Sequence, residues 1–73
     1  MGKLRILSGK DVCGILSGHG FVAVRQAGSH IVMQLRLQGT TVTVPVPNHS
    51  TLRIGTLQSI IRQSGVPRGE FES

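Results

Sequence analysis

The sequence predicts an α+β fold in which a helix is followed by three antiparallel strands and a second helix, with both helices on one face of the sheet. Apolar residues recur at helical spacing near both ends of the chain, and they alternate with polar residues in the middle. Only short breaks separate the alternating segments, as in antiparallel hairpins. With 73 residues and 3% aromatic content, we expect one domain over residues 1–73 with a thin, mainly aliphatic core.

The first helix is expected over residues 9–17. Ser8 followed three residues later by Asp11 forms an acidic variant of the capping box. Gly18 and Gly20 suit the end of a helix. The apolar residues at three- and four-residue spacing are Val12, Ile15 and Leu16.

Three strands are expected in "FVAVRQ", "HIVMQLRL" and "TTVTVPVP". In the second, the apolar residues Ile31, Met33, Leu35 and Leu37 alternate with His30, Val32, Gln34 and Arg36, a period of two that is typical of a half-buried strand. Because proline cannot donate a ladder hydrogen bond, Pro45 and Pro47 place the third strand at a sheet edge. The predicted strand order is therefore first, second, third, with the second strand in the centre.

The register of the strands follows from the turns. A two-residue turn at Gln38 and Gly39 pairs apolar residues throughout: Leu35 with Val42, Met33 with Val44 and Ile31 with Val46. It also sets His30 opposite Pro47 and near His49. For the first hairpin we prefer a three-residue break, "AGS", because it keeps Phe21 on the core side, whereas a two-residue turn directs Phe21 outward.

The second helix is expected in "GTLQSIIRQSG", with Thr56 as its cap and Gly65 at its end. Its apolar positions are Leu57, Ile60 and Ile61. The tail "PRGEF" can return Phe71 to the core.

The charge balance points to an anionic partner. Eight Lys and Arg against three acids give a formal charge of +5 and a pI near 11.3, which attracts polyanions or an acidic protein. The single cysteine, Cys13, cannot form an internal disulfide and fits a half-buried apolar position. Without a secretory signal or a membrane-length apolar run, we expect a cytoplasmic protein that has no membrane partner.

The sequence lacks the residue patterns that several kinds of enzyme chemistry require. There is no carboxylate pair placed for glycosidase chemistry, no glycine-rich phosphate loop and no ligand spacing among the histidines and the cysteine. We therefore expect no metal and no small-molecule cofactor. His19 fits a polar position in a helix-ending turn.

His30 is the candidate for chemistry, because it lies on the sheet face that the helices leave open. RNA carries its own nucleophile in the 2′-hydroxyl, so its cleavage needs a proton acceptor or donor near neutral pH and positive charge on the phosphate. His30 could accept or donate the proton. Arg25, Lys10 and His49 could supply positive charge to the phosphate. A solvated histidine at a strand end explains the same residue, and the residues alone leave both interpretations open.

The order helix, three strands, helix resembles the double-stranded-RNA-binding fold. The segments "LSGKDVCGILSGHGFVAVRQAGSHIVM", "VPVPNHS" and "IGTLQSIIRQSGV" in this order resemble the HicA toxins of HicA–HicB toxin–antitoxin systems. This resemblance covers nearly the whole chain and implies a HicA-like domain, the toxin component of a type II system.

The resemblance implies an mRNA interferase, an endoribonuclease that cleaves RNA without a metal and is blocked by a HicB-type antitoxin. The catalytic histidine of the family's glycine-serine-histidine motif corresponds to His30, and Gly28 and Ser29 match the turn before it. The group that handles the second proton stays open among water, His49 and the substrate. The alternative is a non-catalytic module of the same fold that binds RNA or a protein.

Overall fold

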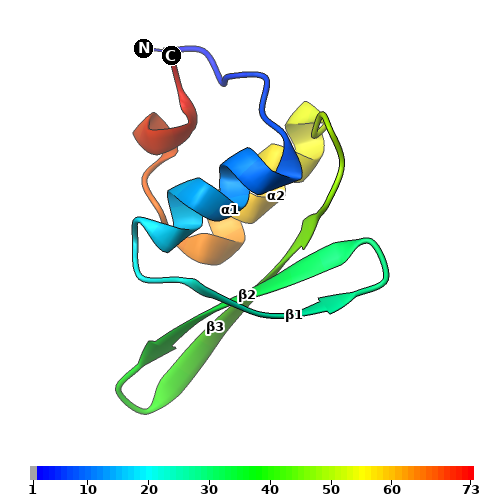
Figure 1. Ribbon diagram of the computed structural model, residues 1–73. Helices are drawn as coiled ribbons and strands as arrows, with labels where there is room; N and C mark the ends of the chain where they lie inside the picture. The colour runs from blue at the N-terminus through cyan, green and yellow to red at the C-terminus, as the bar shows by residue number, and fades with distance from the viewer. Residues whose placement is uncertain (1) are drawn as a thin grey trace.

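The computed structural model describes residues 2–73 and has the predicted order of helix, three strands and helix (Figure 1). The strands form one antiparallel sheet in the order β1-β2-β3, with β2 in the centre. The elements are α1 (Gly9–Ser17), β1 (Val22–Ala27), β2 (His30–Leu37), β3 (Thr40–Pro47), α2 (Ile54–Ser64) and a short 3₁₀ helix, η1 (Arg68–Phe71). The α+β fold and the central position of β2 are thus confirmed.

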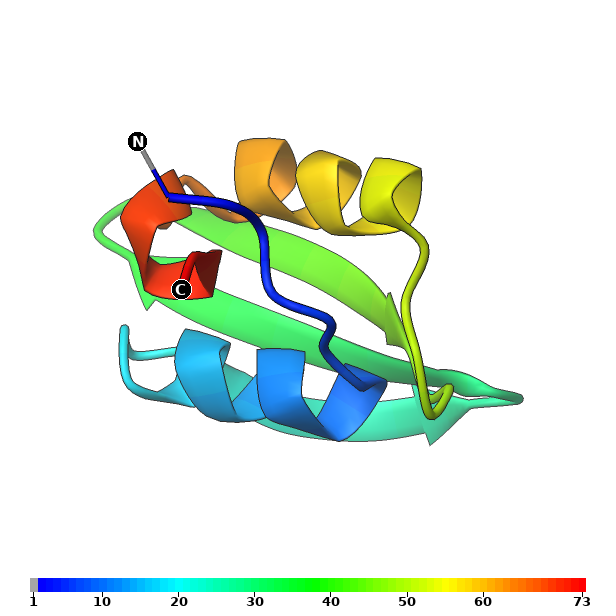
Figure 2. The ribbon, with the colours of Figure 1, turned by 90° about the horizontal axis from the view of Figure 1, so that it is seen from above.

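The hydrophobic core lies between the sheet and the two helices, which run side by side over the same face (Figure 2). Met33, Val44 and Val46 supply the sheet side and are completely buried. Each such side chain contributes roughly 1.5–3 kcal/mol on burial. The helices and the tail supply the opposing side with Val12, Leu16, Leu57, Ile60 and Phe71.

The first helix begins and ends where the sequence predicts. The Ser8 hydroxyl accepts a hydrogen bond of 3.0 Å from the Asp11 backbone N–H, and the Asp11 carboxylate accepts one of 3.0 Å from the Ser8 backbone N–H. These reciprocal bonds satisfy two donors that helix geometry leaves free. At the other end the chain turns at Gly20, whose φ of 92° favours glycine.

The predicted pairing of β2 with β3 is confirmed at every position, from His30 opposite Pro47 to Leu37 opposite Thr40. The turn between them contains Gly39 with a φ of 81°. Ile31, Met33 and Leu35 consequently face the helices. Alternate residues of β2 therefore face the open side of the sheet.

The three-residue break predicted for the first hairpin is wrong. Ala27 pairs with His30, so the turn has two residues, Gly28 and Ser29. Phe21 is nevertheless buried, because a β-bulge between Ala23 and Arg25 inserts one extra residue into β1. A one-residue insertion moves the rest of a strand to the opposite face, and this returns Phe21 to the core.

The second helix begins two residues before the predicted cap. Its N-cap is Arg53, which makes no side-chain capping bond, and Thr56 lies inside the helix. Its end is as predicted, because Gly65 adopts a φ of 71° and its N–H donates to the carbonyl of Ile61. The early start reflects tertiary packing, in which Leu52 is buried and its N–H donates to the carbonyl of Leu7.

The tail returns to the core as expected, and Phe71 is completely buried. The N-terminal segment runs beside it, since the Arg5 N–H donates to the Phe71 carbonyl over 2.9 Å and Leu4 pairs with Glu72 in an isolated β-bridge. The two ends of the described chain therefore lie side by side (Figure 1). Among residues 2–73, no helix combines the length and apolar character needed to cross a membrane.

Gly9 permits a close approach between the first turn of α1 and the end of β3. A Cβ built at this position would overlap the carbonyl oxygen of Pro47 and lie 3.0 Å from the Cα of Asn48. Gly14, in the same helix, has nothing within 4 Å of such an atom. The two glycines provide a matched comparison within one element.

We predict that Gly9→Ala destabilises the protein by about 1–3 kcal/mol, since the added methyl must push apart two backbone segments. Gly14→Ala should stabilise it by about 0.5–1 kcal/mol, because alanine restricts the unfolded chain at an exposed helical position. Urea unfolding followed by circular dichroism measures both. Equal stability of the two variants would contradict the close approach.

The capping box predicts how the stability of the protein depends on pH. Hydrogen bonds from Ser8, first its backbone N–H and then its side chain, hold the pKa of Asp11 below its ordinary value, with a smaller contribution from the charge of Arg5. A lowered pKa stabilises the folded state above the unfolded-state value, near 3.9, and that stabilisation is lost as the pH falls further through the folded-state value. Asp11→Asn should therefore be less stable than the wild type at pH 7, and the difference should shrink below about pH 4. A difference that stays constant down to pH 2 would contradict the role given to the carboxylate.

Candidate functional site

Three segments that are distant in sequence meet at one end of the sheet. They are the β1–β2 turn, the end of β3 with the loop after it, and the N-terminus of α1, which gather on the right of the ribbon in Figures 1 and 2. Every candidate residue except Arg25 lies in one of these segments or at its border. Arg25 lies two residues before the end of β1.

The tight turn at Gly28 and Ser29 fixes the position of His30. Gly28 has a φ of 60°, and glycine at the first central position of a two-residue hairpin turn is the pattern of a type II′ turn. The carbonyl of Ser29 accepts a hydrogen bond of 2.7 Å from the backbone N–H of Asn48. The turn is thereby tied to the end of β3.

His30 is the first residue of β2 and is exposed on the open face of the sheet. Ala27 and Pro47 lie directly opposite it on the neighbouring strands. Arg25 lies on the same face, as a diagonal neighbour of His30, and diagonal neighbours in a sheet are about 7–8 Å apart. A long guanidinium side chain can bridge that distance.

The loop after β3 connects this end of the sheet to the first helix. The backbone N–H of Gly9 donates to the carbonyl of His49 over 2.8 Å, so Lys10, the next residue, is held at the same end of the molecule. The side chains of Lys10 and His49 are both exposed. The structure thus assembles His30, Arg25, Lys10 and His49 at one end of the domain.

Each of the three acids of the chain has a hydrogen-bond or ion-pair partner of its own. Asp11, the nearest in the sequence, accepts the capping bond from Ser8. Glu72 pairs with Arg68 over 2.7 Å, and Glu70 lies 3.2 Å from His19. Among residues 2–73, there is no group of three or more His, Cys, Asp and Glu arranged to hold a metal.

His19 has a structural position, as expected, in the turn that ends α1. Its Nε2 lies 3.2 Å from a carboxylate oxygen of Glu70. This contact joins the turn to η1 and could not be predicted, because 51 residues separate the partners.

Two features of the site escaped the sequence analysis. Val32 lies on the open face yet is only 6% exposed, because Arg25 and Pro45 lie directly opposite it on the two sides. A hollow of about 370 Å³ also opens beside His49. It is lined by Pro47, His49, Thr51, Leu52, Arg53 and Thr56. The only sequence signal for the close packing here is Gly9, a glycine in the first turn of a helix.

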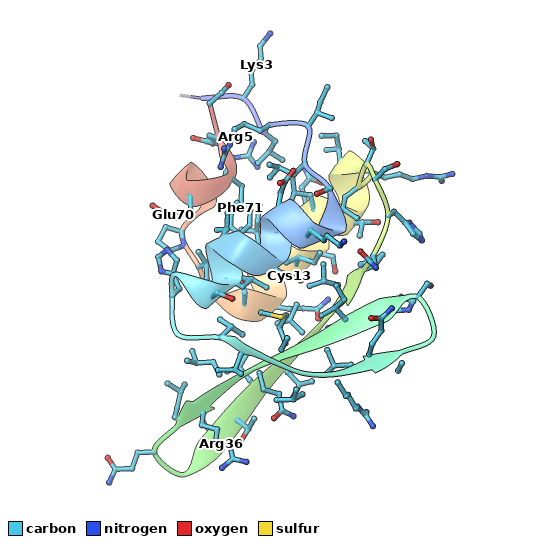
Figure 3. All side chains as sticks on the ribbon, in the orientation of Figure 1. Lys3, Arg5, Cys13, Arg36, Glu70 and Phe71 are labelled. Carbon is cyan, nitrogen blue, oxygen red and sulfur yellow. The ribbon has the colours of Figure 1, made fainter. Side chains whose placement is uncertain are left out.

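Cys13 is half-buried and lies between α1 and the sheet, as Figure 3 shows. Burial raises the pKa of its thiol, which disfavours the reactive thiolate. The expected apolar role of this residue agrees with its position.

We predict that iodoacetamide alkylates Cys13 more slowly in the folded protein at pH 8 than in the same protein unfolded in guanidinium. Mass spectrometry over time gives both rates, and the unfolded protein is the control. Equal rates would show that the thiol is neither shielded nor raised in pKa.

These features define a small α-β-β-β-α domain with an exposed histidine at the start of its central strand. The family model described as the HicA toxin of bacterial toxin–antitoxin matches residues 9–66, and the chain belongs to this family. No curated protein and no solved structure matches the chain significantly. Family membership assigns the chain the role of the toxin in a toxin–antitoxin pair.

Proposed function

We propose that the protein is a metal-independent endoribonuclease that cleaves mRNA, with His30 as its general acid or base, and that a HicB-type antitoxin blocks it. One observation carries the proposal. The histidine that matches the glycine-serine-histidine motif of the HicA family is exposed on the open face of the sheet, at the end where Arg25, Lys10 and His49 also lie.

The chemistry requires little beyond these residues. The 2′-oxygen of a ribose attacks the adjacent phosphorus while its proton is removed, the bond to the 5′-oxygen breaks, and that oxygen gains a proton. Imidazole suits either proton transfer because it titrates near neutral pH. The products are a cyclic phosphate and a free 5′-hydroxyl.

Positive charge supports the same reaction. The phosphate gains negative charge in the transition state, and fixed cations nearby lower the barrier. Arg25 lies diagonally across from His30, and Lys10 is held at the same end through the hydrogen bond between Gly9 and His49. The two cations therefore come from two different elements, β1 and α1.

The backbone around His30 is fixed before the substrate binds. The carbonyl of Ser29 in the β1–β2 turn accepts a hydrogen bond from Asn48, in the loop after β3. The carbonyl of His49, in that same loop, accepts one from Gly9 of α1. Such preorganisation reduces the reorganisation needed during the reaction. His49 is the candidate for the second proton transfer, since its exposed ring belongs to this fixed loop.

The antitoxin is proposed to act by covering the same end. A HicB-type protein with an acidic surface would match the charge of Lys10 and Arg25 and would keep RNA from His30. The exposure of these three side chains leaves that surface open to a protein partner.

The second candidate function is binding of RNA without cleavage, favoured by the basic open face of the sheet. It predicts that RNA is retained intact, with an affinity that falls steeply with salt. The cleavage assay separates the two candidates.

We expect the wild-type protein, freed of its antitoxin, to cleave single-stranded RNA in the presence of EDTA. His30→Ala should lose at least about a hundredfold in rate, the scale of one general acid or base. His49→Ala should lose a similar factor if its ring handles the second proton. Denaturing gels with end-labelled RNA measure the rates, and circular dichroism checks the fold.

His19→Ala is the matched control, because His19 is also exposed but contacts Glu70 on the other side of the domain. It should cleave as fast as the wild type. Equal cleavage by the wild type and His30→Ala would refute the proposed role of His30. Intact RNA with every variant would leave only the binding function.

A further inference from the structure

We infer that single-stranded RNA lies along the open face of the sheet and that Arg36 binds one of its backbone phosphates, far from the bond that is cleaved. The inference rests on the proposed function for the position of the cleaved bond. It adds an RNA-binding surface that extends along β2, from His30 to the β2–β3 turn.

Arg36 lies on the same face of the sheet as His30. Both occupy alternate positions of β2, whose other residues, such as Met33 and Leu35, face the core. Figure 3 shows the Arg36 side chain on the sheet, away from the two helices. Six residues of strand at about 3.3 Å each place it roughly 20 Å from His30, a span of several nucleotides.

The charge of this face is uncompensated. The strands and turns from Val22 to Pro47 contain Arg25, Arg36 and His30 and no acid. The acids lie in α1 and in the tail, where Glu70 and Glu72 face their own partners. Neither of the two ion pairs among residues 2–73 involves Arg36, so its guanidinium is free to bind an anion.

The surface beside Arg36 offers both polar and apolar contacts. A hollow of about 370 Å³ on its β1 side is lined by Val22, Val24 and Gln34, and the valines are 61% and 48% exposed. A second hollow, of about 590 Å³, continues toward Thr41 and Thr43. The hydroxyls can bond phosphate or ribose, and the valines can pack against a base.

This composition favours RNA over a protein as the occupant. A polyanion matches a face with cations and no acids. The chain has no Trp or Tyr, so it lacks the aromatic platforms that hold bases by stacking. Phosphate contacts must then supply most of the affinity, and each cation on the face carries a large share.

The binding test uses His30→Ala, which keeps RNA intact, and a fluorescent single-stranded oligonucleotide of mixed sequence. Adding Arg36→Ala should weaken binding about tenfold, the scale of one charge-assisted hydrogen bond. The slope of log affinity against log salt should fall by about 0.7, the value for one phosphate contact with a single strand. Fluorescence anisotropy at several salt concentrations measures both.

Arg62→Ala is the matched control. Arg62 is an exposed arginine in the last turn of α2, on the opposite layer of the domain. The Arg62→Ala substitution changes the net charge by the same amount as Arg36→Ala, so an effect of net charge alone would weaken RNA binding in both variants. We expect its RNA affinity to be within twofold of the unaltered background.

A second test uses the active protein with RNAs of increasing length. Arg36→Ala should raise KM about tenfold for RNAs long enough to reach position 36 and leave kcat unchanged, because Arg36 is distant from the reacting atoms. For RNAs that end close to the cleaved bond, the two proteins should behave alike. A loss of kcat at every length would overturn the inference.

The outcomes separate this inference from the proposed function. If no variant cleaves RNA but binding still depends on Arg36, the nuclease proposal fails and the binding surface stands. If Arg36→Ala and Arg62→Ala bind RNA equally, the surface is refuted whatever the cleavage result. If Arg36→Ala weakens binding of the purified antitoxin and not of RNA, the face is a protein interface and the inference is also refuted.

Discussion

The alternation of side chains along β2 is the constraint on which the rest of the structure depends. β2 is central, so its two neighbours fix both of its edges, and every second residue must enter the core. Met33 is completely buried for this reason, with Ile31 and Leu35 packed around it. The alternate positions, from His30 to Arg36, are directed to the open face, so β2 has one face in the core and one on the open side of the sheet.

Backbone hydrogen bonds then bring the chemistry of three elements together. The bond from Asn48 to Ser29 joins β3 to the first turn, and the bond from Gly9 to His49 joins α1 to the same loop. Neither bond depends on a charged side chain. The side chains of Lys10 and Arg25 can therefore remain exposed while backbone bonds hold the segments that carry them.

The distribution of charge follows the same division of the fold. The acids belong to α1 and the tail, where they cap a helix or pair with a neighbour, as Asp11 and Glu72 do. The sheet carries cations without acids. The fold thus separates the acids, which lie in α1 and the tail, from the cations of the open sheet face.

The sequence by itself determined the features that depend on neighbouring residues. Ser8 and Asp11 defined the start of α1, and Gly65 defined the end of α2. The apolar alternation defined the register of β2 with β3. Each of these features depends only on residues within one helix turn or one hairpin. Only the tertiary structure decided the bulge in β1, the early start of α2 and the contact of His19 with Glu70. These features depend on distant partners: the bulge exists so that Phe21 can reach a core whose other walls lie far along the chain.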